Sequence, residues 1–360
     1  MGQMGEKGLP FVPFCDKIKE LYRTQERKEL STMVLNLDQI RSIVRGVDRV
    51  EEREDGFYFF RFTKAQEQAY LDGGNEGFCK KITATAGVRL AFRTDASAFS
   101  FDYDFSIGSS RRYAWFDVYV NGQMTEHFGS SGSSVLGGKA SIKLPEGKKT
   151  VELYFPWTYR TVLSNVELKD ATLLEGISRK HTMLTFGDSI TQGYDAVYPS
   201  LSYASLLARL MDADAINKGI GGEMFFPALL EEPDALEPDF VTVAYGSNDW
   251  SHKTYEDTKA RCRAFYARLS ELYPNARIFA ITPIWRGDGM RTTTQFGAPV
   301  TEVDALIREA CADLPNITVI NGWTFVPGRS EFYADLRLHP NDLGFGLYAQ
   351  NLYAEIAKTL

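Results

Sequence analysis

From about residue 180 onward, short apolar runs alternate with amphipathic stretches, and this alternation constrains the fold more than any other feature of the sequence. The apolar runs are 182–186, 213–216, 240–245, 277–281 and 317–320. Helical patterns lie between or after them at 202–211, 255–273, 300–313 and 343–360. Strands that are apolar on both faces and alternate with helices are typical of a parallel sheet covered on both sides. We therefore predict a doubly wound α/β domain over residues 177–360.

Before about residue 176 the pattern is different. A charged stretch at 16–30 predicts a helical lead, and runs rich in strand-forming residues follow at 56–62, 88–92, 98–105, 115–120, 140–144, 150–155 and 163–168. In 98–105, aromatic residues alternate with small or polar ones, which is the period of a half-buried strand. The predicted turns between runs are Asn121-Gly122, Gly137-Gly138 and Pro145-Glu146-Gly147. Residues 1–176 are therefore predicted to form an antiparallel, jelly-roll-like β-sandwich.

Charge and cysteine content exclude several classes of protein. The formal net charge is −7 and the chain has no block of Lys and Arg, so it has no electrostatic reason to bind nucleic acid or an anionic membrane. The four cysteines are scattered without the spacing of a metal site, which favours free thiols. No apolar run has the length of a signal peptide or a membrane span. We expect a cytoplasmic protein, or an extracellular one if a leader was trimmed, without metal or cofactor.

Polar motifs stand at the ends of the apolar runs in the second half, where the strands of a parallel sheet share one edge. They are Gly187-Asp188-Ser189, the segment Asn217 to Glu223, Gly246-Ser247-Asn248-Asp249, and Asp335 to Asp342 before the last helix. A serine hydroxyl becomes a nucleophile when an imidazole takes its proton. Glycine N–H groups and an asparagine amide can hold the oxyanion that forms. The four motifs together predict an acyl-transfer site.

These four segments resemble the conserved blocks of the SGNH, or GDSL-type, hydrolases, over about residues 178–360. The resemblance implies that Ser189 is the nucleophile and that its N–H lines the oxyanion hole. By position in their blocks, Gly222 and Asn248 supply the other two oxyanion donors, and His339 is the general base. His252, which lies near Asn248, is the rival base, but its flanking residues are typical of an exposed loop.

The orienting acid departs from the pattern of this family. The family usually carries an acid three residues before the histidine, and that position is Leu336 here. We predict that Asp335, four residues before His339, takes this role, whereas Asn341-Asp342 opens the last helix and caps it. The alternative is a Ser–His dyad in which a backbone carbonyl holds the imidazole.

The order of a β-sandwich followed by a hydrolase domain resembles carbohydrate esterase family 2, whose members deacetylate xylan and mannan and include dyad-type enzymes. This resemblance implies a serine esterase that removes O-acetyl groups from oligo- or polysaccharides. Trp250 and Trp285 lie on loops of the active edge, where they either stack on sugars or pack in the core. The alternatives are a short-chain acyl esterase or thioesterase, and a carbohydrate-binding protein whose hydrolase half is inert. The sugar, the role of the sandwich and the oligomeric state stay open.

Overall fold

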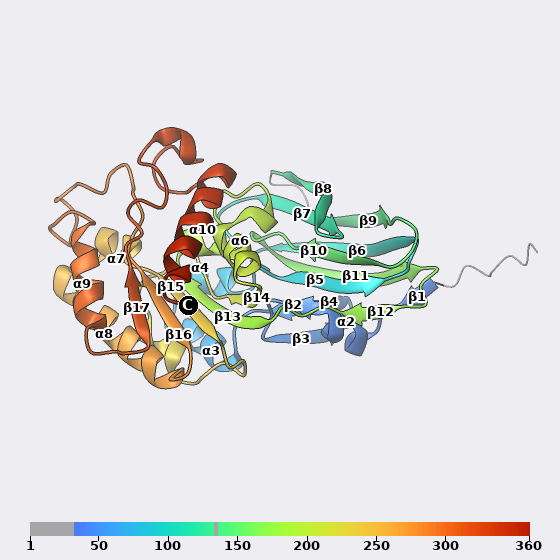
Figure 1. Cartoon of the computed structure of the whole chain (residues 1–360), viewed down its shortest axis with the longest axis horizontal. Coiled ribbons are helices and arrows are strands. Elements are labelled where there is room, and N and C mark those ends of the chain that lie inside the picture. The colour runs from blue at the N-terminus through green and yellow to red at the C-terminus, as the bar shows by residue number, and fades with distance from the viewer. Residues whose placement is uncertain (1–31, 133–135) are drawn as a thin grey trace, which may run out of the picture.

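The computed structural model describes residues 32–132 and 136–360, with the β-sheets of the N-terminal region at the right of Figure 1 and the α/β region at the left. The predicted helical lead at 16–30 lies outside the described residues, as does Cys15. Within the described ranges, no helix has the length and apolar character needed to cross a membrane.

Two antiparallel sheets form the N-terminal region. In the first sheet the order is β3-β4-β11-β6-β9, with β1 paired to β11, and in the second it is β12-β5-β10-β7-β8, with β2 paired to β5. The strands are β1 (Thr32–Val34), β2 (Val44–Arg45), β3 (Arg49–Arg53), β4 (Gly56–Phe60), β5 (Arg89–Thr94), β6 (Ala98–Ile107), β7 (Tyr113–Val120), β8 (Gln123–Ser131), β9 (Gly137–Lys143), β10 (Lys149–Tyr154), β11 (Tyr159–Lys169) and β12 (Leu174–Gly176).

Alternating aromatic residues hold the two sheets together. On β6, Phe99 and Phe101 are buried, whereas the serine between them is half-buried. The Phe99 ring lies 5.3 Å from Phe92 on β5, and the Phe101 ring lies 5.7 Å from Phe116 on β7, both edge to face. Such pairs add about 0.5–1.5 kcal/mol beyond the burial of their area. The period-two pattern of the sequence thus becomes the core of the predicted sandwich.

The turn predicted at Gly137-Gly138 is wrong, because both glycines lie in β9, opposite Asp104 and Tyr103 of β6. A Cβ atom at Gly137 would lie 2.6 Å from the Tyr103 carbonyl oxygen, and one at Gly138 would lie 2.6 Å from the Tyr103 hydroxyl. The glycines therefore allow close approach to β6 rather than a reversal of the chain. The turn at Asn121-Gly122 has positive φ at both residues, 51° and 77°, as a two-residue hairpin requires.

Three helices that were not predicted from the sequence interrupt the sandwich. They are α2 (Leu37–Ile43), α3 (Lys64–Asp72) and α4 (Glu76–Lys81). Thr63 and Gln66 form a reciprocal capping box at the start of α3, and the Asn75 side chain caps α4. Through Tyr70, α3 packs into the core of the C-terminal region rather than into the sandwich. This insertion therefore lies between the two regions of the chain.

A five-stranded parallel sheet forms the C-terminal region, in the order β14-β13-β15-β16-β17. Its strands are β13 (His181–Gly187), β14 (Ala213–Asn217), β15 (Phe240–Ala244), β16 (Arg277–Ile281) and β17 (Ile317–Ile320). The helices are α5 (Ser189–Gln192), α6 (Tyr203–Leu210), α7 (Ser247–His252), α8 (Tyr255–Leu272), α9 (Glu302–Cys311) and α10 (Asp342–Ala357). Short 3₁₀ turns lie at Pro199–Leu201, Pro227–Leu230 and Ser330–Phe332.

The sheet is covered on both faces, as its continuous apolar strands predict. On β13, Leu184 and Phe186 belong to the core shared with α8 and α9, whereas Met183 belongs to the core shared with α6 and α10. Strand order reverses at β13, which lies between β14 and β15, and ligand sites of such sheets form at the carboxyl ends of the strands at this point. The predicted fold class, an antiparallel sandwich followed by a parallel α/β domain, is confirmed.

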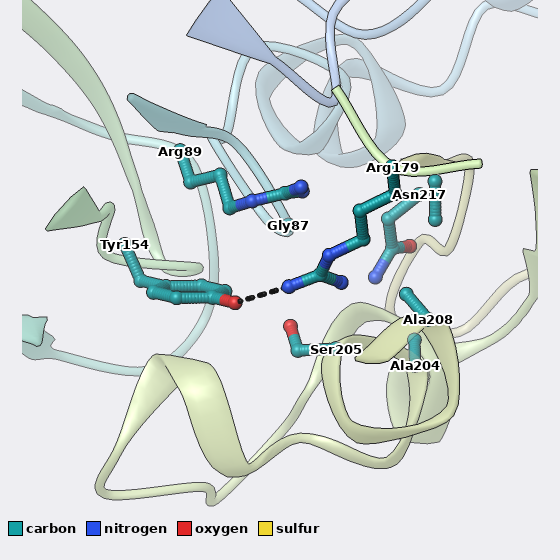
Figure 2. A pocket seen from close by; sticks show the side chains of 9 residues that line it. Gly87, Arg89, Tyr154, Arg179, Ala204, Ser205, Ala208 and Asn217 are labelled. Carbon is teal, nitrogen blue, oxygen red and sulfur yellow. Dashed lines mark hydrogen bonds between the residues drawn. The ribbon is translucent and has the colours of Figure 1, made fainter. Parts of the chain in front are cut away.

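Arginine side chains join the two regions. Arg61, which is fully buried on the sandwich side, donates to the carbonyl oxygens of Asn217, the last residue of β14, and of Gly219 in the loop that follows. Farther from the active edge, Arg179 donates to the Tyr154 hydroxyl over 3.3 Å in the junction shown in Figure 2. The cavity there measures about 10 Å³, which holds one water molecule at most. This part of the junction is therefore closed to any larger ligand.

Candidate active site

Ser189 stands on a sharp turn at the carboxyl end of β13. The Asp188 side chain accepts a hydrogen bond from the Ile190 N–H and so caps α5, leaving Ser189 as the first helical residue. A Cβ atom at Gly187 would lie 2.0 Å from the Thr191 hydroxyl, so only glycine fits there. Ser189 is thus held by its neighbours with 8% of its surface exposed.

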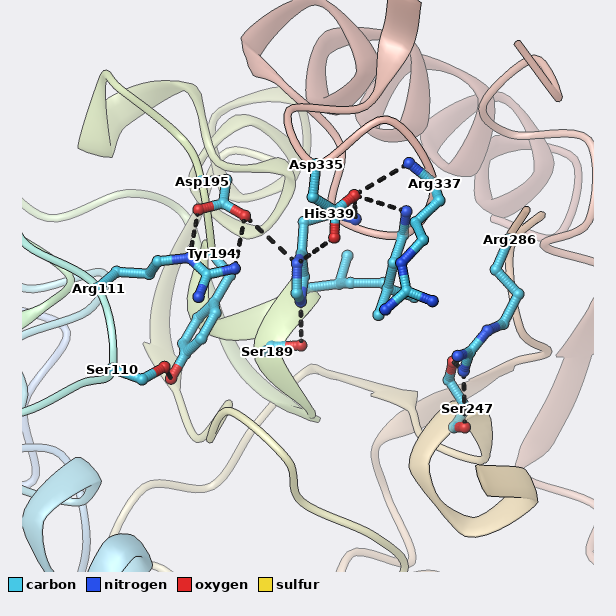
Figure 3. A network of polar contacts seen from close by, with 12 residues as sticks. Ser110, Arg111, Ser189, Tyr194, Asp195, Ser247, Arg286, Asp335, Arg337 and His339 are labelled. Atoms are coloured by element: carbon cyan, nitrogen blue, oxygen red, sulfur yellow. Dashed lines mark hydrogen bonds and ion pairs between the residues drawn. The ribbon is translucent and has the colours of Figure 1, made fainter. Parts of the chain in front are cut away.

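His339 meets this serine from the loop before α10 (Figure 3). The Ser189 Oγ atom and the His339 Nε2 atom are 2.9 Å apart, within hydrogen-bond distance. The loop is fixed by a bridge between Tyr333 and Pro340 and by the Asn341 side chain, which caps α10. The predicted nucleophile and base, 150 residues apart in sequence, are therefore in contact. His252, the rival base, is exposed at the end of α7.

Asp335 lies on the other side of the imidazole. Its Oδ2 atom is 3.0 Å from His339 Nδ1, and its Oδ1 atom accepts hydrogen bonds from the backbone N–H groups of residues 337, 338 and 339. Leu336 takes a left-handed conformation, with φ of 64°, so one extra residue is accommodated between acid and histidine. Although burial opposes it, these hydrogen bonds hold the pKa of Asp335 well below its usual range.

A second carboxylate, which the sequence reading missed, also faces the imidazole. Asp195 Oδ2 lies 3.3 Å from His339 Nδ1, and the carboxylate is 6% exposed. Arg111 from the sandwich binds the same carboxylate through its Nε atom at 2.6 Å and its Nη2 atom at 3.2 Å. Asp195 follows the nucleophile by only six residues, a closeness that could have pointed to it. The hydrogen bonds from His339 and Arg111 outweigh burial and lower the pKa of Asp195.

The two carboxylates together set the charge of the imidazole. Burial lowers the pKa of His339, but the hydrogen bonds to Asp195 and Asp335 outweigh burial, so the pKa lies above its usual value. Asp342 is not a third partner, because its Oδ1 atom accepts from the N–H groups of Val197 and Tyr198. The cap of α10 is Asn341 alone.

The three predicted oxyanion donors lie after consecutive strands of the sheet, Ser189 after β13, Gly222 after β14 and Asn248 after β15. Within the described residues, the N–H groups of Ser189 and Gly222 donate to no protein acceptor. Gly222 has φ of 87°, a conformation that favours glycine. The Asn248 Nδ2 atom donates to the Glu223 carbonyl oxygen at 2.9 Å, which fixes the amide, and its contact with the Asp188 carboxylate is long at 3.4 Å. Burial raises the pKa of Asp188 to about 6.

The expectation that Trp250 stacks on sugars is wrong. Trp250 is fully buried on α7, donates through Nε1 to the Ala298 carbonyl oxygen at 2.7 Å, and is covered by the Arg286 guanidinium group 4.6 Å from its ring. Arg286 also binds Ser247, so it braces the asparagine loop from behind. Trp285 is partly buried with its ring 5.0 Å from that of Tyr333, and its role in sugar binding stays a prediction.

An aromatic cavity of about 160 Å³ lies beside the oxyanion loop instead. Its walls include Tyr70 and Phe78 from the inserted helices and Phe226 from the loop after β14. A methyl group at Gly222 would contact the Phe78 ring at 3.6 Å, so the cavity adjoins the predicted oxyanion hole. The carboxyl of Glu223 also lines it, and burial raises the pKa of that group to about 7. Nothing in the local sequence pattern pointed to this cavity.

Among the described residues, one group of side chains has the spacing of metal ligands, namely Asp195, Asp335 and His339, whose ligand atoms lie within 4.8 Å of one another. Each atom already has a protein partner. Asp195 binds Arg111, Asp335 accepts three backbone N–H groups, and His339 contacts both carboxylates. A dication would have to displace the guanidinium group, so we assign this group to proton transfer.

Comparison with known proteins supports the family recognised in the sequence. Residues 185–347 match the model of the GDSL-like lipase/acylhydrolase family. The match covers the nucleophile turn, the oxyanion loops and His339. No curated protein sequence matches the chain significantly.

Solved structures resemble this chain over both of its regions. The salicylyl-acyltransferase SsfX3 from a tetracycline biosynthetic pathway has a TM-score of 0.77 at 22% identity, covering 93% of this chain and 98% of that one. A family two carbohydrate esterase from Cellvibrio japonicus has a TM-score of 0.64 at 16% identity, covering 91% and 98%. A family two carbohydrate esterase from Clostridium thermocellum, in complex with cellohexaose, has a TM-score of 0.59 at 18% identity, covering 77% and 93%. These likenesses show a shared fold.

Proposed function

We propose that this GDSL-family hydrolase is a serine esterase that removes O-acetyl groups from carbohydrates through an acetyl-enzyme. The observation that carries the proposal is the continuous contact from Ser189 Oγ to His339 Nε2, at 2.9 Å, and from His339 Nδ1 to Asp335, at 3.0 Å. Both distances suit proton transfer and orientation of the base. Both contacts form on the edge of the sheet where the oxyanion donors also stand.

In the first half of the reaction, the Ser189 oxygen attacks the acetyl carbon while its proton passes to His339 Nε2. The carbonyl oxygen becomes an oxyanion, held by the N–H groups of Ser189 and Gly222 and by the Asn248 amide. The intermediate then collapses and breaks the bond between the acetyl carbon and the sugar oxygen. His339 gives its proton to that oxygen, so the sugar leaves as a neutral alcohol.

In the second half, water replaces the sugar. His339 takes one proton from the water as its oxygen attacks the acetyl carbon of the acetyl-enzyme, and the same donors hold the second oxyanion. Collapse breaks the bond to Ser189 Oγ, which recovers its proton from His339, and acetic acid is released. Asp335 keeps the Nδ1–H of His339 directed away from the serine throughout, so Nε2 remains free to accept a proton.

A sugar substrate is supported by the surroundings of the site. The cavity beside Gly222 offers the partly exposed Phe78 and Phe226 rings for stacking, with the buried Tyr70 behind them, and the polar atoms of Asn75 and Glu223 for hydroxyl groups. One family two carbohydrate esterase resembles this chain in fold over 91% of this chain's length, and another was solved with cellohexaose. We therefore propose acetylated oligosaccharides as the substrate class.

The test is acetate release from O-acetylated xylan, mannan and chitin oligomers. The wild-type chain is expected to release acetate from at least one of them, and Ser189→Ala to release none. Ser131→Ala, at an exposed position of β8, is the matched control and keeps full activity. Acetate release by Ser189→Ala at the wild-type rate would refute the proposed nucleophile.

The second candidate is an esterase, thioesterase or acyltransferase for a larger acyl group. The aromatic cavity favours it, because an acyl chain or ring could fill the same space, and the acyltransferase fold is shared over 98% of its length. Two ester series separate the candidates: acetyl esters of different sugars, and 4-nitrophenyl and CoA esters of increasing acyl size. If Phe226→Ala raises KM for acetylated sugars but not for longer acyl esters, the cavity binds the sugar. The reverse result assigns the cavity to the acyl group.

A further inference from the structure

A loop of the sandwich enters the active site and binds a carboxylate that faces the base. This loop, residues 108–112 between β6 and β7, carries Arg111, whose guanidinium group makes two hydrogen bonds to Asp195 at 2.6 and 3.2 Å. Asp195 in turn lies 3.3 Å from His339 Nδ1 (Figure 3). A chain of contacts therefore leads from the sandwich to the proposed general base.

The loop is fixed where it enters. Ser110 Oγ lies 3.2 Å from the Tyr194 hydroxyl, and the Arg111 guanidinium group lies 5.4 Å from the centre of the Tyr194 ring. Arg112 donates to the carbonyl oxygens of Ser109 and Arg111 at 2.8 and 3.0 Å. Tyr194 directly precedes Asp195, so the loop holds this carboxylate from two sides.

We propose that Arg111 is a positioning residue, through which the β-sandwich keeps Asp195 directed at His339 and offsets part of the negative charge that the two carboxylates place beside the imidazole. This inference rests on the proposed role of His339 as general base. It assigns the sandwich a part in the catalytic machinery, whether or not it also binds carbohydrate.

The reason is the balance of charge around one imidazole. Two carboxylates, Asp195 and Asp335, face the Nδ1 atom of His339. Both favour the protonated imidazole, but a protonated His339 cannot take the proton of Ser189. A cation that neutralises one carboxylate opposes this effect. Arg111 is such a cation: its Nε atom binds Asp195 Oδ1, and its Nη2 atom binds Oδ2, the oxygen that faces His339.

The other charged groups near His339 do not perform this task. Asp188, beside the nucleophile, adds negative charge when ionised. The side chain of Arg337 pairs with Asp288, 3.2 Å away, and so does Arg286, at 2.8 Å. Within the described residues, Arg111 is the cation in contact with a carboxylate that faces the imidazole.

The experiment measures the pKa of His339 directly, by NMR titration of the full chain labelled with 15N-histidine. The chain has four histidines, so His339→Gln identifies the signal. Arg111→Met is expected to raise this pKa by about one unit, the lower end of what a nearby charge produces. Asp195→Asn is expected to lower it by a similar amount. Arg111→Lys keeps the charge and should leave the pKa near the wild-type value.

Arg111→Met leaves Asp195 buried without its cation, so the double variant Arg111→Met/Asp195→Asn is prepared as well. If Arg111→Met does not fold, this double variant is compared with Asp195→Asn, and loss of the arginine is again expected to raise the pKa of His339. The proposal is overturned if removal of Arg111, from the wild type or from Asp195→Asn, leaves the pKa of His339 unchanged. The other three histidine signals must be unmoved in that variant, which shows that it is folded.

A parallel kinetic measurement separates this inference from the proposed function. The acidic limb of kcat/KM for 4-nitrophenyl acetate should move to higher pH in Arg111→Met by the same amount as the NMR pKa. If the wild-type chain hydrolyses no ester, the proposed function fails, and the NMR titration still decides whether Arg111 sets the protonation of His339. If esters are hydrolysed but the limb does not move with the pKa, His339 is not the group that this limb reports, and the catalytic part of the inference fails.

Discussion

Because Asp195 and Asp335 both contact His339, we predict that either carboxylate partly orients the imidazole when the other is removed. Asp335 makes the shorter contact, at 3.0 Å against 3.3 Å for Asp195. A hydrogen bond to a charged group contributes about 1.5–3 kcal/mol, and about 1.4 kcal/mol corresponds to a tenfold change in rate. Asp335→Ala should therefore lower kcat by about 10- to 150-fold. Asp195→Ala should cost about tenfold, because that contact is longer and the carboxylate is shared with Arg111.

Removal of both carboxylates should cost more than the product of the two single losses. An imidazole without any orienting carboxylate loses about 10⁴-fold in the well-studied serine proteases. We expect a loss of this size in Asp195→Ala/Asp335→Ala, because neither acid is left to hold the Nδ1–H. The assay is steady-state hydrolysis of 4-nitrophenyl acetate, with circular dichroism to check folding.

The control is Asp313→Ala, an exposed position just beyond α9, which should not change kcat. A loss of about 10⁴-fold in Asp335→Ala alone would refute the reasoning, because Asp195 would then give no support. A double variant no slower than Asp335→Ala would also refute it. If neither carboxylate mattered, the imidazole would be oriented by other groups, as the dyad alternative proposes.

Further predictions concern the other groups of the site. Ser189→Ala and His339→Ala should each abolish acetate release, and the double variant should be no slower, because the two residues act as a unit. Asn248→Ala should lower kcat by about 10²–10³-fold with little change in KM. Gly222→Ala finds space, with Phe78 at 3.6 Å, but its φ of 87° should reduce both kcat and the free energy of unfolding, the latter by about 1–2 kcal/mol in urea titration. Burial raises the pKa of Asp249 to about 7, so the folded protein binds a proton that the unfolded chain releases near pH 4. Stability in urea should therefore fall as pH rises from 5 to 8, and less so in Asp249→Asn.

Local patterns predicted the sheets of both regions, but not the helices α2, α3 and α4 inserted in the first. The apolar runs of the second half became five parallel strands because a run that is apolar on both faces is stable only under two layers of helices. The period-two run at 98–105 became β6 because alternating apolar and polar residues suit a strand that buries only one face. The glycines at 137–138 wrongly predicted a turn. Glycine is required there because the backbone and ring of Tyr103 lie close by, and Tyr103 is far away in the sequence.

Some residues could be placed in the site but not oriented. The position of Trp250 after Asn248 put it on the active edge, yet α7 turns its ring inward beneath Arg286. The six-residue helix α7 decides the orientation of the ring, and the surrounding sequence does not indicate that this helix forms. Asp335 was the nearest acid to His339, but its reach depends on the left-handed conformation of Leu336.

The sequence by itself determined the sheet, the nucleophile turn and the residues that meet at its edge. This follows because strand ends in a parallel sheet converge whatever the details of packing. Only the tertiary structure decided what surrounds the base. Arg111 and Asp195 are 84 residues apart, and Phe78 and Gly222 lie in different regions of the chain. Such pairs form only where the sandwich and its inserted helices dock on the parallel sheet, and no periodicity in either segment records the other.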